Sequence, residues 1–353
     1  KAKRENTRRQ GDGDVNDETV AETGESPDTA ATKGPKERLS SVLESNTLVG
    51  SDKRRNDSLR ELWRWRQSVD ESYNVFRTTM WWKEDNEYLI TPLLSRFNDS
   101  QRARATKERL YTALQRSHAG NSVGVLLTLT VDPKRVDGHT AALEKLHDSW
   151  EKLRSRLKYQ FGQSVDMAKA LEWQDSGMPH FHVALFGVRK VPAGESETGE
   201  PTLSEAELRQ WWDTDYNVGS QVTVQSVHER GDRWLLHDGD QRVSLRYYMG
   251  KASRRLVELA SMSEAELREV VNDGDLSLWK QALYWVHEER YVTCSPDLKE
   301  TTDNEYPPVA QWEYVGTMRF SQIPESVRNN AIVSNLSRPP PATSSAKSPA
   351  TTG

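Results

Sequence analysis

Residues 166–187, DMAKALEWQDSGMPHFHVALFG, contain two apolar segments separated by a short polar stretch. Segments 166–173 and 180–187 have the length and composition of β-strands, and QDSGMP between them is typical of a hairpin connection. We therefore predict an antiparallel hairpin here. Side chains at positions i and i+2 of a strand share a face, so His180 and His182 point the same way and the phenylalanine between them points to the opposite face.

The hairpin also brings a carboxylate toward the histidine pair. Glu172 lies eight residues before His180, near the end of the first strand, and folding across the turn places it level with the imidazoles. One carboxylate and two imidazoles form a three-ligand site that leaves positions open for water or a phosphate oxygen, as Mg²⁺ or Mn²⁺ chemistry requires, although zinc accepts the same ligands. Glu172, His180 and His182 are therefore candidate metal ligands. The alternative is that the histidines are ordinary polar residues on a solvated face.

The segments around the hairpin indicate an α+β fold. Residues 123–131, VGVLLTLTV, read as a buried strand, and residues 139–160 repeat apolar side chains at steps of three and four, as an amphipathic helix does. Ser204 opens a capping box, a strand follows at 222–227, and 244–260 reads as a helix. The order β-α-β-β-α-β-α, with a hairpin at its centre, predicts an antiparallel central sheet with flanking helices rather than a doubly wound parallel sheet.

Composition divides the chain into five parts. Residues 1–57 and 325–353 are poor in large apolar side chains, and we predict that both are disordered tails. Residues 58–118 alternate basic and aromatic residues and read as helical, a pattern that fits either nucleic-acid contact or an amphipathic cap on the next domain. The strands and the hairpin fall within 119–260, and 261–324 is predicted to be a helical, aromatic extension.

Charge and cysteine content limit the classes of protein. The chain of 353 residues has a net charge of −5 and one cysteine. A single cysteine excludes a disulfide framework, and no apolar run is long enough to span a membrane, so we expect a cytoplasmic protein without a membrane partner. The negative net charge argues against nucleic acid as a partner, but basic residues cluster locally, and a local patch can hold phosphates when the total charge is negative.

A second cluster, RYYMGKASRR at 246–255, contains a candidate nucleophile. On a helix Tyr248 and Lys251 share a face, whereas Tyr247 is rotated by about 100° from its neighbour. A phenol, with an ordinary pKa of about 10, attacks phosphorus only when its phenolate is stabilised, and Lys251 with a metal ion would do so. Without the histidines, the same residues are explained as core aromatics beside a solvated basic face.

Three motifs together resemble a known family. The segment LLTLTVDP (126–133), the spacing E-x7-H-x-H ending in PHFHV, and YYMGK (247–251) are similar to motifs 1, 2 and 3 of the HUH endonucleases, the rolling-circle replication initiator (Rep) proteins. The tyrosine follows the histidines, as in Rep proteins, whereas relaxases carry it before them. The resemblance covers residues 120–255. The segment 279–298, WKQALYWVHEERYVTCSPDL, is similar to the C-terminal part of replication proteins from haloarchaeal plasmids and small viruses.

The resemblance implies a function for each motif. The three candidate ligands would hold a divalent metal, Mg²⁺ or Mn²⁺. Tyr248 would attack the scissile phosphate, leaving a 5′-phosphotyrosine and a free 3′-hydroxyl, with Lys251 orienting the phosphate oxygens, and the same site would rejoin ends. The substrate would be single-stranded DNA at a replication origin, bound with the help of Arg246, Tyr247, Arg254 and Arg255. Because the sequence has no P-loop motif, a host helicase and polymerase are the expected partners.

Three alternatives remain open at this point. The pair Tyr247-Tyr248 leaves the nucleophile ambiguous, and we favour Tyr248 because a lysine stands three residues after it. A single-tyrosine HUH transposase would share the site but act on other DNA. A non-catalytic origin-binding or repressor protein would keep the fold without the reaction.

Overall fold

The computed structural model describes residues 52–78, 88–118, 121–162, 164–195, 201–238, 241–273, 278–299, 312–329 and 331–333. Most of the two predicted tails lies outside these ranges. The structure nevertheless shifts both tail boundaries. Helix α2 (Asp52–Asp70) begins before residue 57, and α10 (Glu325–Asn329) with β13 (Ala331–Val333) lies past residue 325. Helix α2 is stabilised by packing, because Leu59 and Leu62, one turn apart, are both buried.

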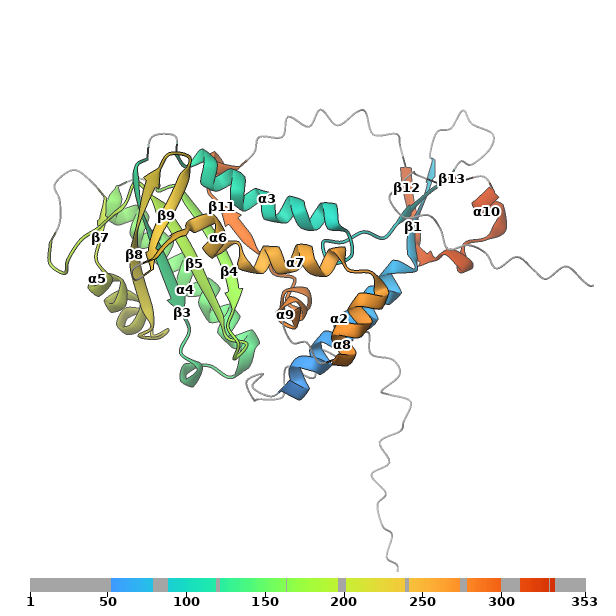
Figure 1. Ribbon diagram of the computed structural model, residues 1–353, viewed down its shortest axis with the longest axis horizontal. Helices are drawn as coiled ribbons and strands as arrows, with labels where there is room; N and C mark the ends of the chain where they lie inside the picture. Colours follow the sequence, from blue (N-terminus) through green and yellow to red (C-terminus); the bar gives the residue numbers. More distant parts are fainter. Residues whose placement is uncertain are drawn as a thin grey trace, which may run out of the picture. The chain divides into compact units, whose positions relative to one another are not determined.

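A seven-stranded antiparallel sheet is the main element of the fold (Figure 1). In spatial order its strands are β10 (Gln241–Ser244), β9 (Arg233–Asp238), β8 (Val222–Arg230), β3 (Val123–Thr130), β5 (Pro179–Phe186), β4 (Met167–Trp173) and β11 (Val292–Cys294). Each neighbouring pair is antiparallel. The predicted α+β class and the β4–β5 hairpin are confirmed, whereas strands β9 and β10 were not predicted.

Helices cover both faces of this sheet. In the view of Figure 1, α4 (Gly138–Phe161) lies behind it, and α3 (Ser100–Arg116) and α6 (Leu245–Met249) lie in front. The face toward α4 carries large apolar side chains, among them Leu127 and Phe181. The face toward α3 and α6 also carries large side chains, such as Phe186 and Trp234, but it has small ones at Ala170 and Ala184. Both faces are therefore buried, but the second leaves more room for polar groups.

The histidine pair lies on the face toward α3 and α6. Phe181 and Val183, which alternate with the histidines, belong to the core on the α4 side, as the strand period predicts. His180 and His182 are only 8% and 3% exposed. The interpretation of the pair as polar residues on a solvated face is therefore wrong.

Helix α4 matches the prediction for residues 139–160. It ends at Gly162, whose φ of 65° is the left-handed conformation that glycine adopts most readily. The apolar residues predicted to form one stripe are all buried against the sheet: Leu143, Leu146, Trp150, Leu153 and Leu157.

The segment 244–260 was predicted as one helix, and the structure divides it. Strand β10 ends at Ser244, α6 follows, and α7 (Lys251–Ser261) begins after a break at Gly250. A Cβ at this glycine would lie 2.6 Å from the carbonyl oxygen of Arg246, so only glycine fits here. The break falls between Tyr248 and Lys251, whose relation to each other therefore depends on the junction as well as on helical periodicity.

A second sheet, with strand order β12–β1–β2–β13, corrects the prediction for residues 58–118. That region is helical at its ends, in α2 and α3, but strands β1 and β2 lie between them. The partner of β1 comes from far along the chain, since Ser72 pairs with Arg319. The basic-aromatic pattern was local and contained no information on this distant pairing. The new strands are β1 (Ser72–Thr78), β2 (Tyr88–Pro92) and β12 (Trp312–Arg319).

The remaining elements connect these parts. The predicted extension 261–324 contains helices, but β11 and β12 make it mixed rather than helical. The capping box of Ser204 with Glu207 is confirmed, and Cys294 is half-buried without a disulfide. Within the described ranges, no helix has the length and apolar character needed to cross a membrane. The other bounds are η1 (Pro133–Arg135), β6 (Arg189–Lys190), β7 (Thr202–Leu203), α5 (Glu205–Arg209), η2 (Gln210–Asp215), α8 (Glu264–Asp273), α9 (Lys280–Val286), η4 (Pro296–Leu298) and η5 (Phe320–Gln322).

Candidate metal centre and adjoining cavity

Glu172 and the two histidines meet because of the hairpin register. In the β4–β5 pairing, Glu172 lies directly opposite His180, and His182 is the next residue on the same face. Gly177 in the connecting turn has a φ of 83°, which favours glycine and lets the chain reverse within a few residues. The hairpin predicted from QDSGMP therefore places the carboxylate beside the imidazoles, as expected.

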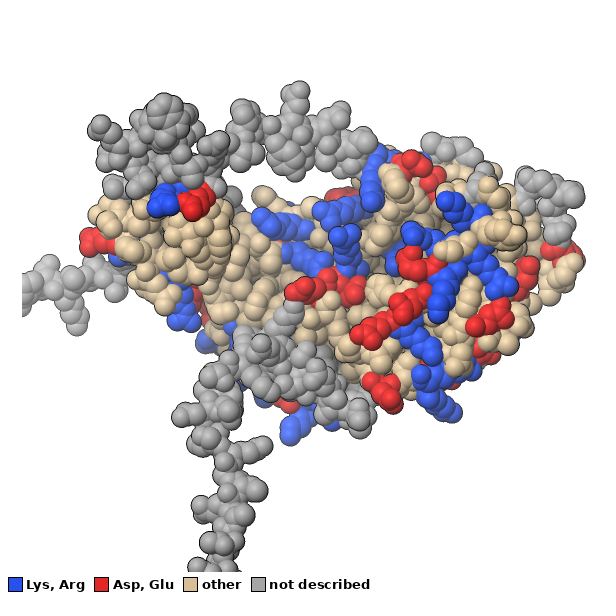
Figure 2. Space-filling view, turned by 180° about the vertical axis from the view of Figure 1, so that it is seen from behind, with Lys and Arg blue, Asp and Glu red and all other residues tan. Residues whose placement is uncertain are grey.

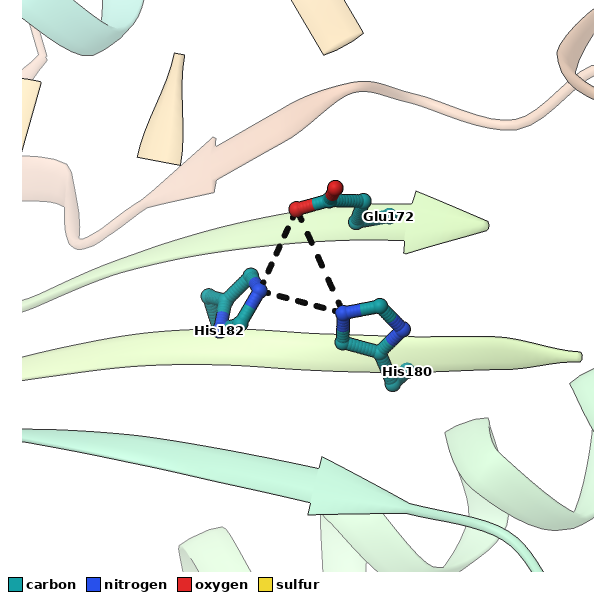
Figure 3. Close-up of side chains that lie close together, drawn as sticks. All are labelled: Glu172, His180 and His182. Atoms are coloured by element: carbon teal, nitrogen blue, oxygen red, sulfur yellow. Dashed lines mark hydrogen bonds and ion pairs between the residues drawn. The ribbon is translucent and has the colours of Figure 1, made fainter. Parts of the chain in front are cut away.

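Three donor atoms of this cluster converge (Figure 3). The Nε2 atoms of His180 and His182 are 3.1 Å apart, and the Oε2 atom of Glu172 lies 3.2 Å from Nε2 of His182 and 4.0 Å from Nε2 of His180. Adjacent donors around an octahedral ion with bonds of about 2.1 Å are about 3.0 Å apart. The donor types and their convergence therefore fit one divalent cation, which these three residues would hold.

The protonation states also suit a metal ligand set. Burial disfavours the charged form of Glu172, but the hydrogen bond and charge of His182, helped by His180 and Lys251, outweigh it and lower the pKa of the carboxyl group to about 2. Burial and the neighbouring His182 lower the pKa of His180 to about 3. At neutral pH the carboxylate is ionised and the His180 ring is neutral, and these are the forms that bind cations.

Strand β3 orients one of the two imidazoles. Thr128 lies opposite His182 in the β3–β5 pairing, and its Oγ1 atom is 3.2 Å from Nδ1 of His182. When the hydroxyl oxygen accepts a hydrogen bond from the Nδ1–H group, the Nε2 atom is unprotonated and can bind a cation. In the described part of the chain, Nδ1 of His180 is buried without a hydrogen-bond partner. The sequence predicted only a buried strand here, similar to motif 1, and the contact of Thr128 with His182 was not predicted.

The two tyrosines of α6 point in different directions. The ring of Tyr248 lies against His182, with centroids 4.9 Å apart, and the Lys251 ammonium is 4.5 Å from the Tyr248 ring centroid. Tyr247 is 60% exposed and packs against the guanidinium of Arg254 at 4.1 Å. The predicted proximity of Tyr248 to Lys251 and to the histidines is therefore present in the structure.

The predicted basic residues are spread over two sides of this helix pair. Arg246 stacks on Tyr111 of α3 at 3.5 Å, whereas Arg255 forms an ion pair of 2.6 Å with Glu258 on α7. On the face shown in Figure 2, basic and acidic side chains are interspersed. Although the net charge of the chain is −5, that face is therefore not uniformly acidic.

A cavity of about 630 Å³ adjoins the cluster through Glu172. Tyr247, Arg254 and Arg255 line it, whereas Tyr248 does not. Sequence analysis did not assign a role to the residues that α9 and its preceding turn contribute, although the similarity of 279–298 to replication proteins pointed at that segment. The residues lining the cavity are Glu172, Trp173, Asp175, Tyr247, Lys251, Ala252, Arg254, Arg255, Glu258, Trp279, Lys280, Gln281 and Tyr284.

Comparison with known proteins agrees with the motifs. Residues 124–232 match the family model of the replication-associated protein ORF2. Over 233 residues the chain is 31% identical to Uncharacterized protein 1 of Halorubrum pleomorphic virus 1, a match that covers 61% of this chain and 44% of that protein. The chain thus spans less than half the length of this relative. No solved structure matches the chain.

The family match confirms the predicted resemblance to replication-associated proteins, and the relative is a protein of a haloarchaeal virus, as the predicted similarity to haloarchaeal proteins implied. The matched region contains β3, β4 and β5, so it includes the three candidate ligands and Thr128, but it ends before α6, α7 and α9.

Proposed function

We propose that this protein initiates rolling-circle replication by nicking and rejoining single-stranded origin DNA through a tyrosine. One observation carries the proposal, namely that Tyr248 lies against His182 at the edge of a converging Glu172-His180-His182 cluster. A nucleophile and a ligand set for a phosphate-activating ion are thereby brought together from separate elements. The similarity to a replication-associated family supports the same conclusion.

Glu172, His180 and His182 would hold a divalent cation in this site. Carboxylate and imidazole donors suit Mg²⁺ or Mn²⁺, and such an ion supplies Lewis-acid polarisation of the scissile phosphate. The β4–β5 pairing keeps the three donors in place, and Thr128 holds the His182 ring with Nε2 toward them.

Tyr248 is the proposed nucleophile. Its phenolate oxygen attacks the phosphorus, forms a 5′-phosphotyrosine ester and releases the 3′ oxygen, which takes up a proton to become the free hydroxyl. The Lys251 ammonium, 4.5 Å from the ring centroid, stabilises the phenolate. Because one phosphate ester replaces another, the bond energy is retained, and the reverse attack by a 3′-hydroxyl rejoins the strand without ATP.

A covalent trapping experiment tests this function. Labelled single-stranded origin DNA with Mn²⁺ should give an adduct that survives SDS, and Tyr248→Phe should abolish the adduct because the phenol oxygen is removed. Tyr247→Phe is the matched control and should retain it, since that ring turns toward Arg254. Loss of the adduct in Tyr247→Phe but not in Tyr248→Phe would identify Tyr247 as the nucleophile. No adduct with any origin-derived strand would favour a non-catalytic origin-binding protein.

The DNA strand would be held by the basic and aromatic residues around α6 and α7. Arg254, Arg255 and Tyr247 line the cavity beside Glu172, and Arg246 lies on the side toward α3. A host helicase and polymerase would then unwind and extend the nicked molecule. Hairpin ends flanking the gene, in place of a replication origin beside it, would favour the transposase alternative.

A further inference from the structure

We propose that the cavity beside Glu172 binds the phosphodiester backbone of single-stranded DNA, with Arg254 and Lys280 as phosphate-binding residues and Tyr247 as a stacking surface for a base. This inference rests on the proposed function, since it identifies where the strand next to the scissile phosphate lies. It also gives α9, which lies outside the region matched by the family model, a direct part in substrate binding.

The position of the cavity is the first observation that supports DNA binding there. Glu172 belongs both to the metal-ligand cluster and to the cavity wall. A polynucleotide whose scissile phosphate lies at the cluster continues on both sides of that phosphate, and we place one of these sides in the adjoining cavity. With a volume of about 630 Å³, the cavity is large enough for a nucleotide-sized group.

The charged side chains that line the cavity are the second observation. Lys251, Arg254, Arg255 and Lys280 all contribute, and two of them are already paired, Arg255 with Glu258 and Lys280 with Asp175 at 2.8 Å. Within the described ranges, neither Lys251 nor Arg254 forms an ion pair with a carboxylate, and the Nη1 atom of Arg254 is buried without a hydrogen-bond partner. A guanidinium that lines a cavity and has no carboxylate partner is suited to bind an anion there.

Tyr247 supplies the aromatic component. Its ring is 60% exposed, which is unusual for a large aromatic side chain, and the Arg254 guanidinium holds it at 4.1 Å. An exposed ring beside cations is the combination that single-strand binding sites use, with stacking on a base and ionic contact to the backbone.

The ion pair between Lys280 and Asp175 is the element that responds to DNA. Asp175 lies in the turn of the β4–β5 hairpin, and its side chain is 88% exposed. A phosphate that binds Lys280 displaces this carboxylate, which then becomes fully hydrated. The turn itself stays attached, because Arg55 of α2 donates a separate hydrogen bond of 2.7 Å to the Asp175 carbonyl oxygen.

Substitutions of Lys280 and of Asp175 should change DNA binding in opposite directions, and this difference tests the assignment. Binding of fluorescein-labelled oligothymidylate to the full chain is measured by anisotropy in EDTA over a range of salt concentrations. Lys280→Gln and Arg254→Gln should each weaken binding by about fivefold to tenfold and reduce the salt slope by about 0.7, as expected for one lost phosphate contact on a single strand. Asp175→Asn should tighten binding by about twofold to fivefold, because a competing carboxylate is removed.

Arg154→Gln is the matched control. Arg154 lies on α4, which covers the other face of the sheet, and its loss removes the same charge. Circular dichroism confirms that each variant is folded. Equal weakening by Lys280→Gln and Asp175→Asn would mean that the pair only tethers the hairpin, and that result would overturn the proposal. Binding equal to that of Arg154→Gln in all variants would overturn it as well.

The trapping experiment separates this inference from the proposed function. If wild-type protein forms the covalent adduct, Lys280→Gln should raise the DNA concentration needed for half-maximal adduct formation without changing the rate at saturation. An unchanged half-maximal concentration would refute the cavity assignment and leave the nicking function intact. If no adduct forms but the binding changes appear in the predicted directions, the cavity assignment stands and the nicking function fails.

Discussion

Strand β4 carries a buried lysine, Lys169, and a half-buried glutamate, Glu172, that point to opposite faces of the central sheet. Lys169 lies on the α4 side, 8% exposed, with its ammonium 4.0 Å from the Phe181 ring centroid. Within the described ranges it forms no ion pair with a carboxylate, and burial lowers its pKa to about 8. Glu172, on the other face, meets two imidazoles and keeps its charge, with a pKa of about 2.

The difference shows what each face of the sheet does. On the α4 side, large apolar residues fill the space, and a charge there is a cost to stability. On the side toward α3 and α6, the neighbouring strand residues Ala170 and Ala184 are small, so polar groups can converge and compensate one another. The candidate chemistry is therefore confined to the second face, and the first face acts as its rigid support.

The largest effect is expected from removing the negative charge of Glu172, which the neighbouring imidazoles stabilise. Glu172→Gln keeps the shape of the side chain but removes the anionic donor, so Mn²⁺ affinity measured by calorimetry should fall by at least about 100-fold. Glu151→Gln removes an equal charge from an exposed position on α4, which covers the other face of the sheet, and should leave Mn²⁺ affinity unchanged. Unchanged affinity in Glu172→Gln would show that this carboxylate is not a ligand.

Removing the buried ammonium of Lys169 should stabilise the protein. A pKa lowered from 10.5 to about 8 corresponds to about 3 kcal/mol, which the cation–π contact with Phe181 offsets by about 1 kcal/mol. Lys169→Met, which fills the same space, should therefore raise the free energy of unfolding at pH 7 by about 2 kcal/mol in urea titrations.

The pH dependence of that gain follows from the lowered pKa. The cost of the charged ammonium is fully present below pH 8, and it disappears as the pH rises toward the unfolded-state value of 10.5. The stability difference between Lys169→Met and wild type should therefore shrink over this window. Lys152→Met, on the exposed side of α4, is the matched control for the loss of a lysine side chain. A destabilised Lys169→Met at pH 7 would mean that the lysine makes a favourable buried interaction.

The smallest effect is expected from the hydroxyl that orients His182. Thr128→Val preserves shape but removes the acceptor for Nδ1, so Mn²⁺ affinity should fall by about tenfold, whereas Thr128→Ser should retain it. Thr130 lies opposite His180 in the same strand pair, where Nδ1 has no partner in the described chain, so Thr130→Val is the matched control. Equal losses in both valine variants would indicate a packing effect and not an orienting hydrogen bond.

The hairpin, helix α4 and the ligand cluster were predictable because each depends on short-range rules. Alternation along a strand places His180 and His182 on one face, and a six-residue connection with a glycine limits the register that brings Glu172 beside them. Helical period likewise predicted the buried stripe of α4. These features follow from side-chain direction and chain geometry over a few residues.

Other features depended on which distant segments pack together. The strands β1 and β2 exist because β12 pairs with β1 from the far end of the chain, and a basic-aromatic pattern cannot indicate that partner. The role of Thr128 required the β3–β5 register, and the place of Lys280 at the cavity required α9 to pack near α7. Such pairings are selected by burial and loop closure over the whole chain.

The sequence by itself therefore determined the class of fold and which three residues are the candidate ligands, because both are encoded in local spacing. Only the tertiary structure decided that the histidines are buried, that Tyr248 lies against His182, and that a cavity lined by both cationic and anionic side chains adjoins Glu172. These properties arise when separate elements exclude water from a shared surface, and no single segment contains that information.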